Sequence, residues 1–128
     1  MIGSDQVAVC EDNIIGKPGN HQNACEQLSR FSGKQVDFHT GLALINQNLK
    51  QAYYHCETVQ VHFKPLNSQV INNYLKKDTP YDCAGSFKVE SLGVVLFEKV
   101  ISEDPTALEG LPLIALCRLF EKAGVSIV

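Results

Sequence analysis

The sequence lacks the patterns that mark membrane, secreted and nucleic-acid-binding proteins. Its longest apolar stretches, residues 42–45 and 94–97, are far shorter than the roughly 20 residues of a membrane-spanning helix. No basic segment leads into an apolar one near Met1, so no signal peptide is indicated. Lys and Arg are scattered and the formal net charge is −3, which leaves no basic stripe for nucleic acid or an anionic membrane. We therefore expect a cytoplasmic protein with neither of these partners.

The cysteines and histidines also lack the spacing of structural sites. The five cysteines never form a C-x-x-C pair, so neither a disulfide framework nor a zinc knuckle is indicated. We expect them to act as small buried hydrophobic residues. The four histidines lack the H-x-x-x-H spacing of a helical zinc site. We expect them at the surface, or partly buried with polar partners.

What remains is the composition of one folded domain. The chain has 128 residues, of which 45% are hydrophobic and 20% charged, so it is long enough to bury a core as a single domain over residues 1–128. The periodicity of apolar residues predicts a mixed α+β fold with largely antiparallel strands. Strands are expected at residues 7–10, 36–45, 58–64 and 94–101, with the second and third forming a hairpin.

Three helices are expected between and after these strands. The first follows a cap at Asn20 and ends near Gly33, and the second follows a cap at Asn67 or Ser68. The second should bury Val70, Ile71, Tyr74 and Leu75. The last begins near Pro112 and should bury Leu113, Leu116, Leu119 and Phe120.

Three short segments carry residues suited to chemistry. Residues 3–6 read G-S-D-Q and offer the carboxylate of Asp5 at a loop-to-strand junction. Residues 16–18 read G-K-P and offer a cation on a glycine-bounded loop, and a third loop offers Lys88 and Glu90 beside Phe87. Taken singly, these segments also fit a turn, a solvated lysine and a weak surface ion pair.

Taken in order along the chain, five phrases resemble one family. They are G-S-D-Q at 3–6, G-K-P at 16–18, F-H-T-G-L-A-L at 38–44, P-Y-D-C-A-G-S-F-K at 80–88 and G-L-P-L-I-A-L-C at 110–117. Together they resemble the Maf family of nucleoside triphosphate pyrophosphatases over nearly the whole chain. C-A-G-S-F-K followed by acidic Glu90 is similar to the 7-methyl-GTP branch, whereas the dTTP/UTP branch carries A-G-A-Y-G-I-Q-G there. The resemblance implies a Maf/inosine triphosphatase-like α/β sheet with flanking helices and a cleft.

The resemblance also implies an activity and its residues. The expected reaction hydrolyses 7-methyl-GTP to 7-methyl-GMP and pyrophosphate with a divalent cation, Mg²⁺ or Mn²⁺. Asp5 takes the catalytic position and is the expected metal ligand, while Gln6 and Glu90 take positions that set substrate specificity. Lys17 and Lys88 are candidates for contacts to the phosphates, because each supplies a point charge.

The acidic character of Glu90 has a physical reason. Methylation at N7 gives guanine a positive charge and makes its N1–H a stronger donor, so a carboxylate gains charge-assisted hydrogen bonds that glutamine would lose. Phe87 or Tyr81 could stack on the cationic ring, although Phe87 also fits a place in the core.

The family resemblance further implies an N-terminal strand and an arginine-bearing loop ahead of G-S-D-Q, whereas only four residues precede Asp5 here. We expect an N-terminally truncated domain without that strand, whose uncovered edge lowers stability or pairs with another chain, as in a homodimer. Two alternatives to 7-methyl-GTP hydrolysis are a dTTP/UTP pyrophosphatase and a non-catalytic remnant that binds nucleotide or self-associates.

Overall fold

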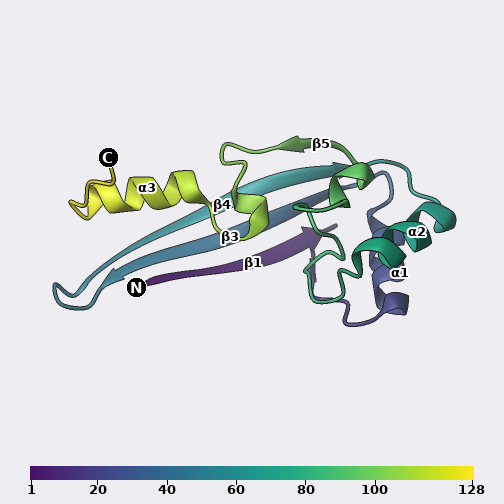
Figure 1. Cartoon of the computed structure of the whole chain (residues 1–128), viewed down its shortest axis with the longest axis horizontal. Coiled ribbons are helices and arrows are strands. Elements are labelled where there is room, and N and C mark those ends of the chain that lie inside the picture. The colour runs from purple at the N-terminus through teal and green to yellow at the C-terminus, as the bar shows by residue number, and fades with distance from the viewer.

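The computed structural model describes residues 1–128 as one antiparallel sheet with helices toward its two ends (Figure 1). The strand order is β2-β1-β3-β4-β5. The strands are β1 Ile2–Cys10, β2 Asn13–Ile15, β3 Gln35–Asn46, β4 Gln51–Phe63 and β5 Phe97–Ile101. The helices are α1 His21–Phe31, α2 Ser68–Asp78 and α3 Leu113–Lys122, with short 3₁₀ helices η1 Gly93–Leu96 and η2 Ala107–Glu109. The predicted mixed α/β class is confirmed. None of the helices combines the length and the hydropathy of a membrane span.

Strands β3 and β4 form the long hairpin that the alternating pattern predicted. Every second side chain along β3 is buried, and the register sets Phe38 opposite Val59 in the core. β4 begins at Gln51, well before the predicted start at Thr58. Its first half pairs fully with β3 although its side chains are mostly exposed, so the hydrophobic pattern alone could not detect it.

Helices α1 and α2 begin at the predicted caps. The side-chain oxygen of Asn20 accepts a 2.8 Å hydrogen bond from the N–H of Asn23, and that of Asn67 accepts one of 2.8 Å from Val70. The buried stripe of α2 is narrower than predicted. Ile71, Tyr74 and Leu75 are buried, but the Val70 side chain lies outside the stripe and is 41% exposed, so the prediction for Val70 is wrong.

The segment predicted as one strand over residues 94–101 divides into two elements. Residues 93–96 form η1, and only Phe97–Ile101 joins the sheet as β5. The N–H of Gly93 donates a 2.9 Å hydrogen bond to the carbonyl of Lys88, which turns the chain back before it reaches β4. The run of apolar residues therefore predicted a strand that is longer than β5.

Helix α3 packs against the hairpin at the end away from α1 and α2 (Figure 1). Pro112 is its N-cap residue, close to the predicted start. Its buried residues are Ala115, Leu116 and Leu119. Leu113 is 47% exposed, so the prediction that it faces inward is wrong, whereas Leu116 and Leu119 are buried as predicted.

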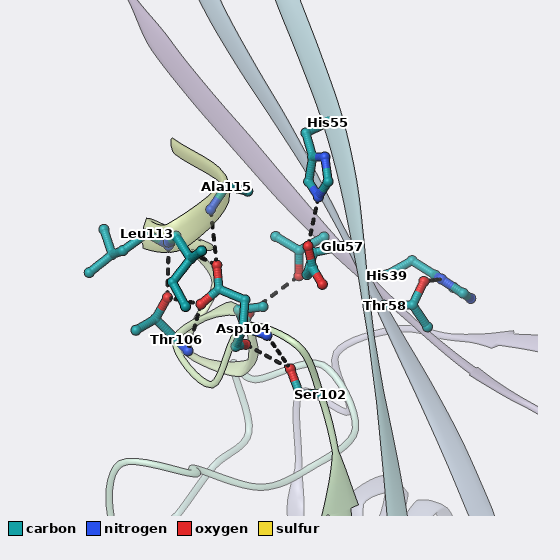
Figure 2. A network of polar contacts seen from close by, with 12 residues as sticks. His39, His55, Glu57, Thr58, Ser102, Asp104, Thr106, Leu113 and Ala115 are labelled. Atoms are coloured by element: carbon teal, nitrogen blue, oxygen red, sulfur yellow. Dashed lines mark hydrogen bonds and ion pairs between the residues drawn. The ribbon is translucent and has the colours of Figure 1, made fainter. Parts of the chain in front are cut away.

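The first turn of α3 is held by a buried carboxylate in the preceding loop. Asp104 Oδ2 accepts hydrogen bonds from the N–H groups of Ile114 at 2.9 Å and Ala115 at 3.2 Å, while Oδ1 accepts from Thr106 (Figure 2). Burial alone would raise the pKa of the Asp104 carboxyl, but these hydrogen bonds outweigh it and lower the pKa. Asp104 thus replaces the N-cap side chain that Pro112 cannot supply.

The five cysteines are free, as predicted, but not all are buried. Cys10 lies in the core, whereas Cys56 and Cys117 are exposed, so the prediction of burial is wrong for these two. The histidines are half-buried and three have polar partners; His55, for example, lies 2.6 Å from a carboxylate oxygen of Glu57 (Figure 2).

A polar row divides the core into two hydrophobic clusters. Gln6, Thr40 and Glu57 stand opposite one another on β1, β3 and β4. On one side, Phe38 belongs to a cluster of 19 residues, some of which come from α1 and α2. On the other, Leu42 belongs to a cluster of five residues formed by β3 and α3. The row therefore crosses the sheet at the level of G-S-D-Q.

Candidate active site

The G-S-D-Q segment lies inside strand β1, not at the predicted loop-to-strand junction. Residues 3–6 pair with β3 in continuous register, from Gly3 opposite Ala43 to Gln6 opposite Thr40. Gly, Ser and Asp have low strand propensity, which is why the sequence predicted a strand only from Val7. The pairing with β3 overrides that preference and keeps the backbone around Asp5 extended.

Alternation along β1 sends neighbouring side chains to opposite faces of the sheet. Ser4 and Gln6 turn to the face that the loops before α3 cover. Ser4 Oγ donates a 2.9 Å hydrogen bond to the carbonyl of Gly110, and Gln6 Nε2 donates one of 3.2 Å to the carbonyl of Ala107. Asp5 is exposed, and its Oδ1 accepts a 2.9 Å hydrogen bond from the Gln6 N–H.

A cavity of about 250 Å³ brings four of the predicted site residues together. Asp5 and Gln6 reach it from β1, Lys17 from the G-K-P loop and Glu90 from the loop after α2. Its complete lining is Asp5, Gln6, Lys17, Phe38, Asp82, Cys83, Ala84, Phe87, Val89, Glu90, Leu108 and Glu109. Segments far apart in the sequence therefore meet at one site.

Lys88 is not among the residues that line this cavity. Its backbone N–H donates a 2.8 Å hydrogen bond to the Tyr74 hydroxyl, and its charge contributes to lowering the pKa of Asp78. Both lysines were predicted to contact phosphate, but the structure places them in different surroundings. Lys17 lines the cavity with Asp5, whereas Lys88 interacts with the end of α2.

Glu90 lies in a turn that the end of α2 holds in place. Asp78 accepts hydrogen bonds from Ser91 Oγ at 2.8 Å and from the Leu92 N–H at 2.9 Å. Burial alone would raise the pKa of the Asp78 carboxyl, but these hydrogen bonds outweigh it and lower the pKa. A Cβ at Gly93 would overlap the carbonyl of Lys88, so the turn also depends on that glycine.

Phe87 takes the core position that the sequence left open. Its ring packs edge-to-face against Phe38, Phe63 and Phe97, and it is 6% exposed. Only part of it contributes to the cavity wall. Tyr81 is half-buried and its hydroxyl lies 3.1 Å from Nδ1 of His21, away from the cavity lining.

The cavity is negatively charged. Four acidic residues, Asp5, Asp82, Glu90 and Glu109, are among its lining residues, against one basic residue, Lys17. No group of three or more His, Cys, Asp or Glu side chains converges to hold a metal by itself. Acidic residues therefore outnumber basic ones around this cavity.

A second, larger hollow of about 590 Å³ lies on the sheet face opposite the helices. Gly3, Asp5, Gly41, Tyr54 and Cys56 line it along β1, β3 and β4. Asp5 lines both hollows, and alternation along β1 turns its side chain to the open face of the sheet, opposite that of Gln6.

Sequence reasoning missed several residues of the site. Asp82 lies within the phrase P-Y-D-C-A-G-S-F-K and Glu109 directly before G-L-P-L, so both phrases were noted without a role for these carboxylates. Thr40 is fully buried and contacts Gln6; it stands in the phrase F-H-T-G-L-A-L and at a core position of β3, and neither signal was given a role. The strand register is what joins Thr40 to Gln6.

Comparisons with known proteins extend over the same segments. The family model described as Maf-like protein matches residues 1–123. The chain is 48% identical to a 7-methyl-GTP pyrophosphatase of Idiomarina loihiensis over 98% of its own length and 64% of that protein. It is 47% identical to that of Vibrio cholerae and 48% identical to that of Colwellia psychrerythraea, over its whole length and 66% and 64% of those proteins. The chain thus spans less than two thirds of these relatives.

Proposed function

Since the chain belongs to the Maf family, we propose that it is a nucleotide pyrophosphatase that hydrolyses 7-methyl-GTP to 7-methyl-GMP and pyrophosphate. The observation that carries this proposal is the cavity in which Asp5, Gln6, Lys17 and Glu90 meet from three separate segments. The relatives named above are 7-methyl-GTP pyrophosphatases, which supports the choice of substrate.

Asp5 is the proposed catalytic residue. Water attacks the α-phosphorus, the bond from that phosphorus to the oxygen bridging it to the β-phosphate breaks, and pyrophosphate leaves. A carboxylate beside the attacking water can accept its proton and release it to solvent. Asp5 Oδ1 is engaged with the Gln6 N–H, which leaves Oδ2 free for this role or for a metal.

We propose Mg²⁺ or Mn²⁺ as the cofactor, with Asp5 as the ligand from the protein. Mg²⁺ is commonly held by one or two carboxylates together with substrate phosphates and water, and one free carboxylate oxygen at Asp5 fits that pattern. Such a cation, when bound, would offset negative charge on the phosphoryl group that is attacked. The negative lining of the cavity supports this requirement.

At the base end, Glu90 and Gln6 are the proposed specificity residues. The Glu90 carboxylate can accept hydrogen bonds from N1–H and the amino group of 7-methylguanine. Hydrogen bonds to a charged group are each worth about 1.5–3 kcal/mol, enough for roughly tenfold discrimination or more between bases.

At the phosphate end, Lys17 is the first candidate because it lines the cavity with Asp5. Lys88 remains a predicted phosphate contact, with a smaller expected effect because it does not line the cavity. Homodimer formation, a cytoplasmic location and the absence of a nucleic-acid partner also remain predictions of the sequence.

Pyrophosphate release tests the proposal. The purified chain is incubated with 7-methyl-GTP, GTP, dTTP and UTP in the presence and absence of Mg²⁺ or Mn²⁺. We expect metal-dependent release that is fastest on 7-methyl-GTP and falls at least 100-fold in Asp5→Asn, as removal of a catalytic group does. Asp12→Asn is the matched control, because Asp12 is exposed in the β1–β2 turn and outside the cavity.

Three outcomes contradict the proposal. Release that is equal in Asp5→Asn and the unaltered chain removes Asp5 from catalysis. A preference for dTTP or UTP assigns the chain to the other branch. Absence of turnover on every nucleotide, in a sample that is folded, supports the non-catalytic alternative instead.

A further inference from the structure

Gln6 reaches the cavity from the polar row, and its amide group is held by two partners. Gln6 Nε2 lies 3.1 Å from Thr40 Oγ1 and 3.2 Å from the carbonyl oxygen of Ala107. Thr40 Oγ1 lies 3.3 Å from the same carbonyl. The three groups close a small triangle of hydrogen bonds, and Thr40, the member on β3, is fully buried.

These contacts fix which end of the Gln6 carboxamide faces each neighbour. A carbonyl oxygen only accepts hydrogen bonds, so the Gln6 atom beside Ala107 has to be the amide nitrogen. The Thr40 hydroxyl has one proton, which it donates to Ala107, and its oxygen therefore accepts from Gln6. A reversed carboxamide would set its oxygen against the Ala107 carbonyl, and Thr40 could donate to that oxygen only by giving up its own hydrogen bond to Ala107.

The remaining end of the carboxamide is its oxygen. Gln6 Oε1 has no hydrogen-bond partner in the protein, and the single buried polar side-chain atom without a partner is His62 Nε2. Gln6 Oε1 is therefore accessible to solvent, on a residue that lines the cavity together with Glu90. We propose that Thr40 is a positioning residue, which turns Gln6 so that an oxygen and not an NH₂ group is offered to the ligand.

This inference rests on the proposed function, because it concerns how the same cavity selects a base. Gln6 Oε1 and the Glu90 carboxylate are both acceptors, and they match a base edge with neighbouring N–H donors. The N1–H and amino groups of 7-methylguanine form such an edge. Thymine and uracil offer one N–H between two carbonyl oxygens, so one acceptor of the protein would face an oxygen. Thr40 thus contributes to selection without touching the ligand.

Two substitutions at Thr40 separate orientation from packing. Thr40→Val keeps the shape and removes the hydroxyl, whereas Thr40→Ser keeps the hydroxyl and removes a methyl group. In Thr40→Val we expect kcat/KM for 7-methyl-GTP to fall about tenfold, mainly through a higher KM, while kcat/KM for dTTP is unchanged or rises. Thr40→Ser should keep the preference of the unaltered chain. Equal loss in both variants, or an unchanged preference in Thr40→Val, would overturn the proposal.

An NMR measurement tests the orientation without any turnover. The side-chain NH₂ signals of Gln6, assigned by their loss in Gln6→Met, should exchange with solvent more slowly than those of exposed Gln51. The protection should persist in Thr40→Ser and decrease in Thr40→Val. Exchange of Gln6 as fast as that of Gln51 in the unaltered chain would overturn the proposal. If the chain hydrolyses no nucleotide, the proposed function fails and this measurement alone decides the role of Thr40.

If Thr40→Val does not fold, substitutions at Gln6 test the orientation of the carboxamide instead. Gln6→Glu replaces the amide nitrogen with an oxygen that faces the Ala107 carbonyl, and Gln6→Met removes both polar atoms. The fixed orientation predicts a lower melting temperature for Gln6→Glu than for Gln6→Met at neutral pH. The reverse order would show that no NH₂ group is required beside Ala107.

Discussion

Asp78, at the end of α2, accepts a 2.8 Å hydrogen bond from Ser91, the residue that follows Glu90. A second hydrogen bond, 2.9 Å from the Leu92 N–H, reaches the other oxygen of the same carboxylate. Asp78 is only 8% exposed, so these contacts are shielded from water. A helix whose start could be read from the sequence therefore fixes the loop that carries a proposed specificity residue.

Removing this carboxylate should loosen the Glu90 turn. Asp78→Ala leaves the Leu92 N–H and the Ser91 hydroxyl without their partner, and we expect the free energy of unfolding to fall by about 2–3 kcal/mol. Ser91→Ala removes one hydrogen bond and should cost about 1 kcal/mol. Urea denaturation of both variants measures the difference. An equal, small effect in both would mean that the turn is held by other contacts.

The lowered pKa values of Asp78 and Asp104 predict a loss of stability in acid. In both, hydrogen bonds outweigh burial and lower the pKa of the carboxyl in the folded chain. Each carboxylate therefore adds stability above the pKa of an unfolded aspartate, about 4, and this stability is lost as the pH falls toward the folded value. Unfolding free energies should be level near neutral pH and decline below about pH 4. Asp104→Asn should reduce that decline; an identical pH profile would contradict the assignment.

Gly93 should be intolerant of any side chain. A Cβ there would overlap the backbone of Lys88, which cannot move without displacing the Glu90 turn. We expect Gly93→Ala to lower the unfolding free energy by about 1–3 kcal/mol. Gly16→Ala is the matched control, since a Cβ at Gly16 meets nothing within 4 Å. Equal melting temperatures for the two variants would contradict the predicted clash.

The elements that sequence could predict are those whose local signals agree with their packing. The Asn20 cap predicts the start of α1, and the apolar alternation predicts β3. The structure contains both elements. The strand conformation of residues 3–6 was not predicted, because residues of these types favour turns. Pairing with β3 makes the segment extended. The conformation of residues 3–6 is therefore set by their position in the sheet, which the local sequence does not encode.

The candidate site divides in the same way. Resemblance of short phrases predicted Asp5, Gln6, Lys17 and Glu90, and the structure brings all four to one cavity. Thr40 lies in the phrase F-H-T-G-L-A-L, but its contact with Gln6 could not be predicted, because it depends on the two residues standing opposite each other on adjacent strands. Residues that act through another side chain become visible only when the register is known.

The two lysines should differ in their effect on substrate affinity. Lys17 lines the cavity and Lys88 does not. We expect Lys17→Met to raise KM for 7-methyl-GTP about tenfold, because a charge-assisted contact to phosphate is lost. Lys88→Met should change KM by less. Steady-state kinetics of both variants compare them, and a larger effect at Lys88 would place the phosphates outside this cavity.

The preference between 7-methyl-GTP and dTTP, measured as the ratio of kcat/KM values for the unaltered chain and Glu90→Gln, tests the central claim most directly. We predict that the unaltered chain prefers 7-methyl-GTP and that Glu90→Gln lowers this ratio about tenfold or more, since the charge of the acceptor is lost. Glu98→Gln, at an exposed position on β5, should leave the ratio unchanged. No release of pyrophosphate from 7-methyl-GTP, or a ratio that Glu90→Gln does not alter, would contradict the account.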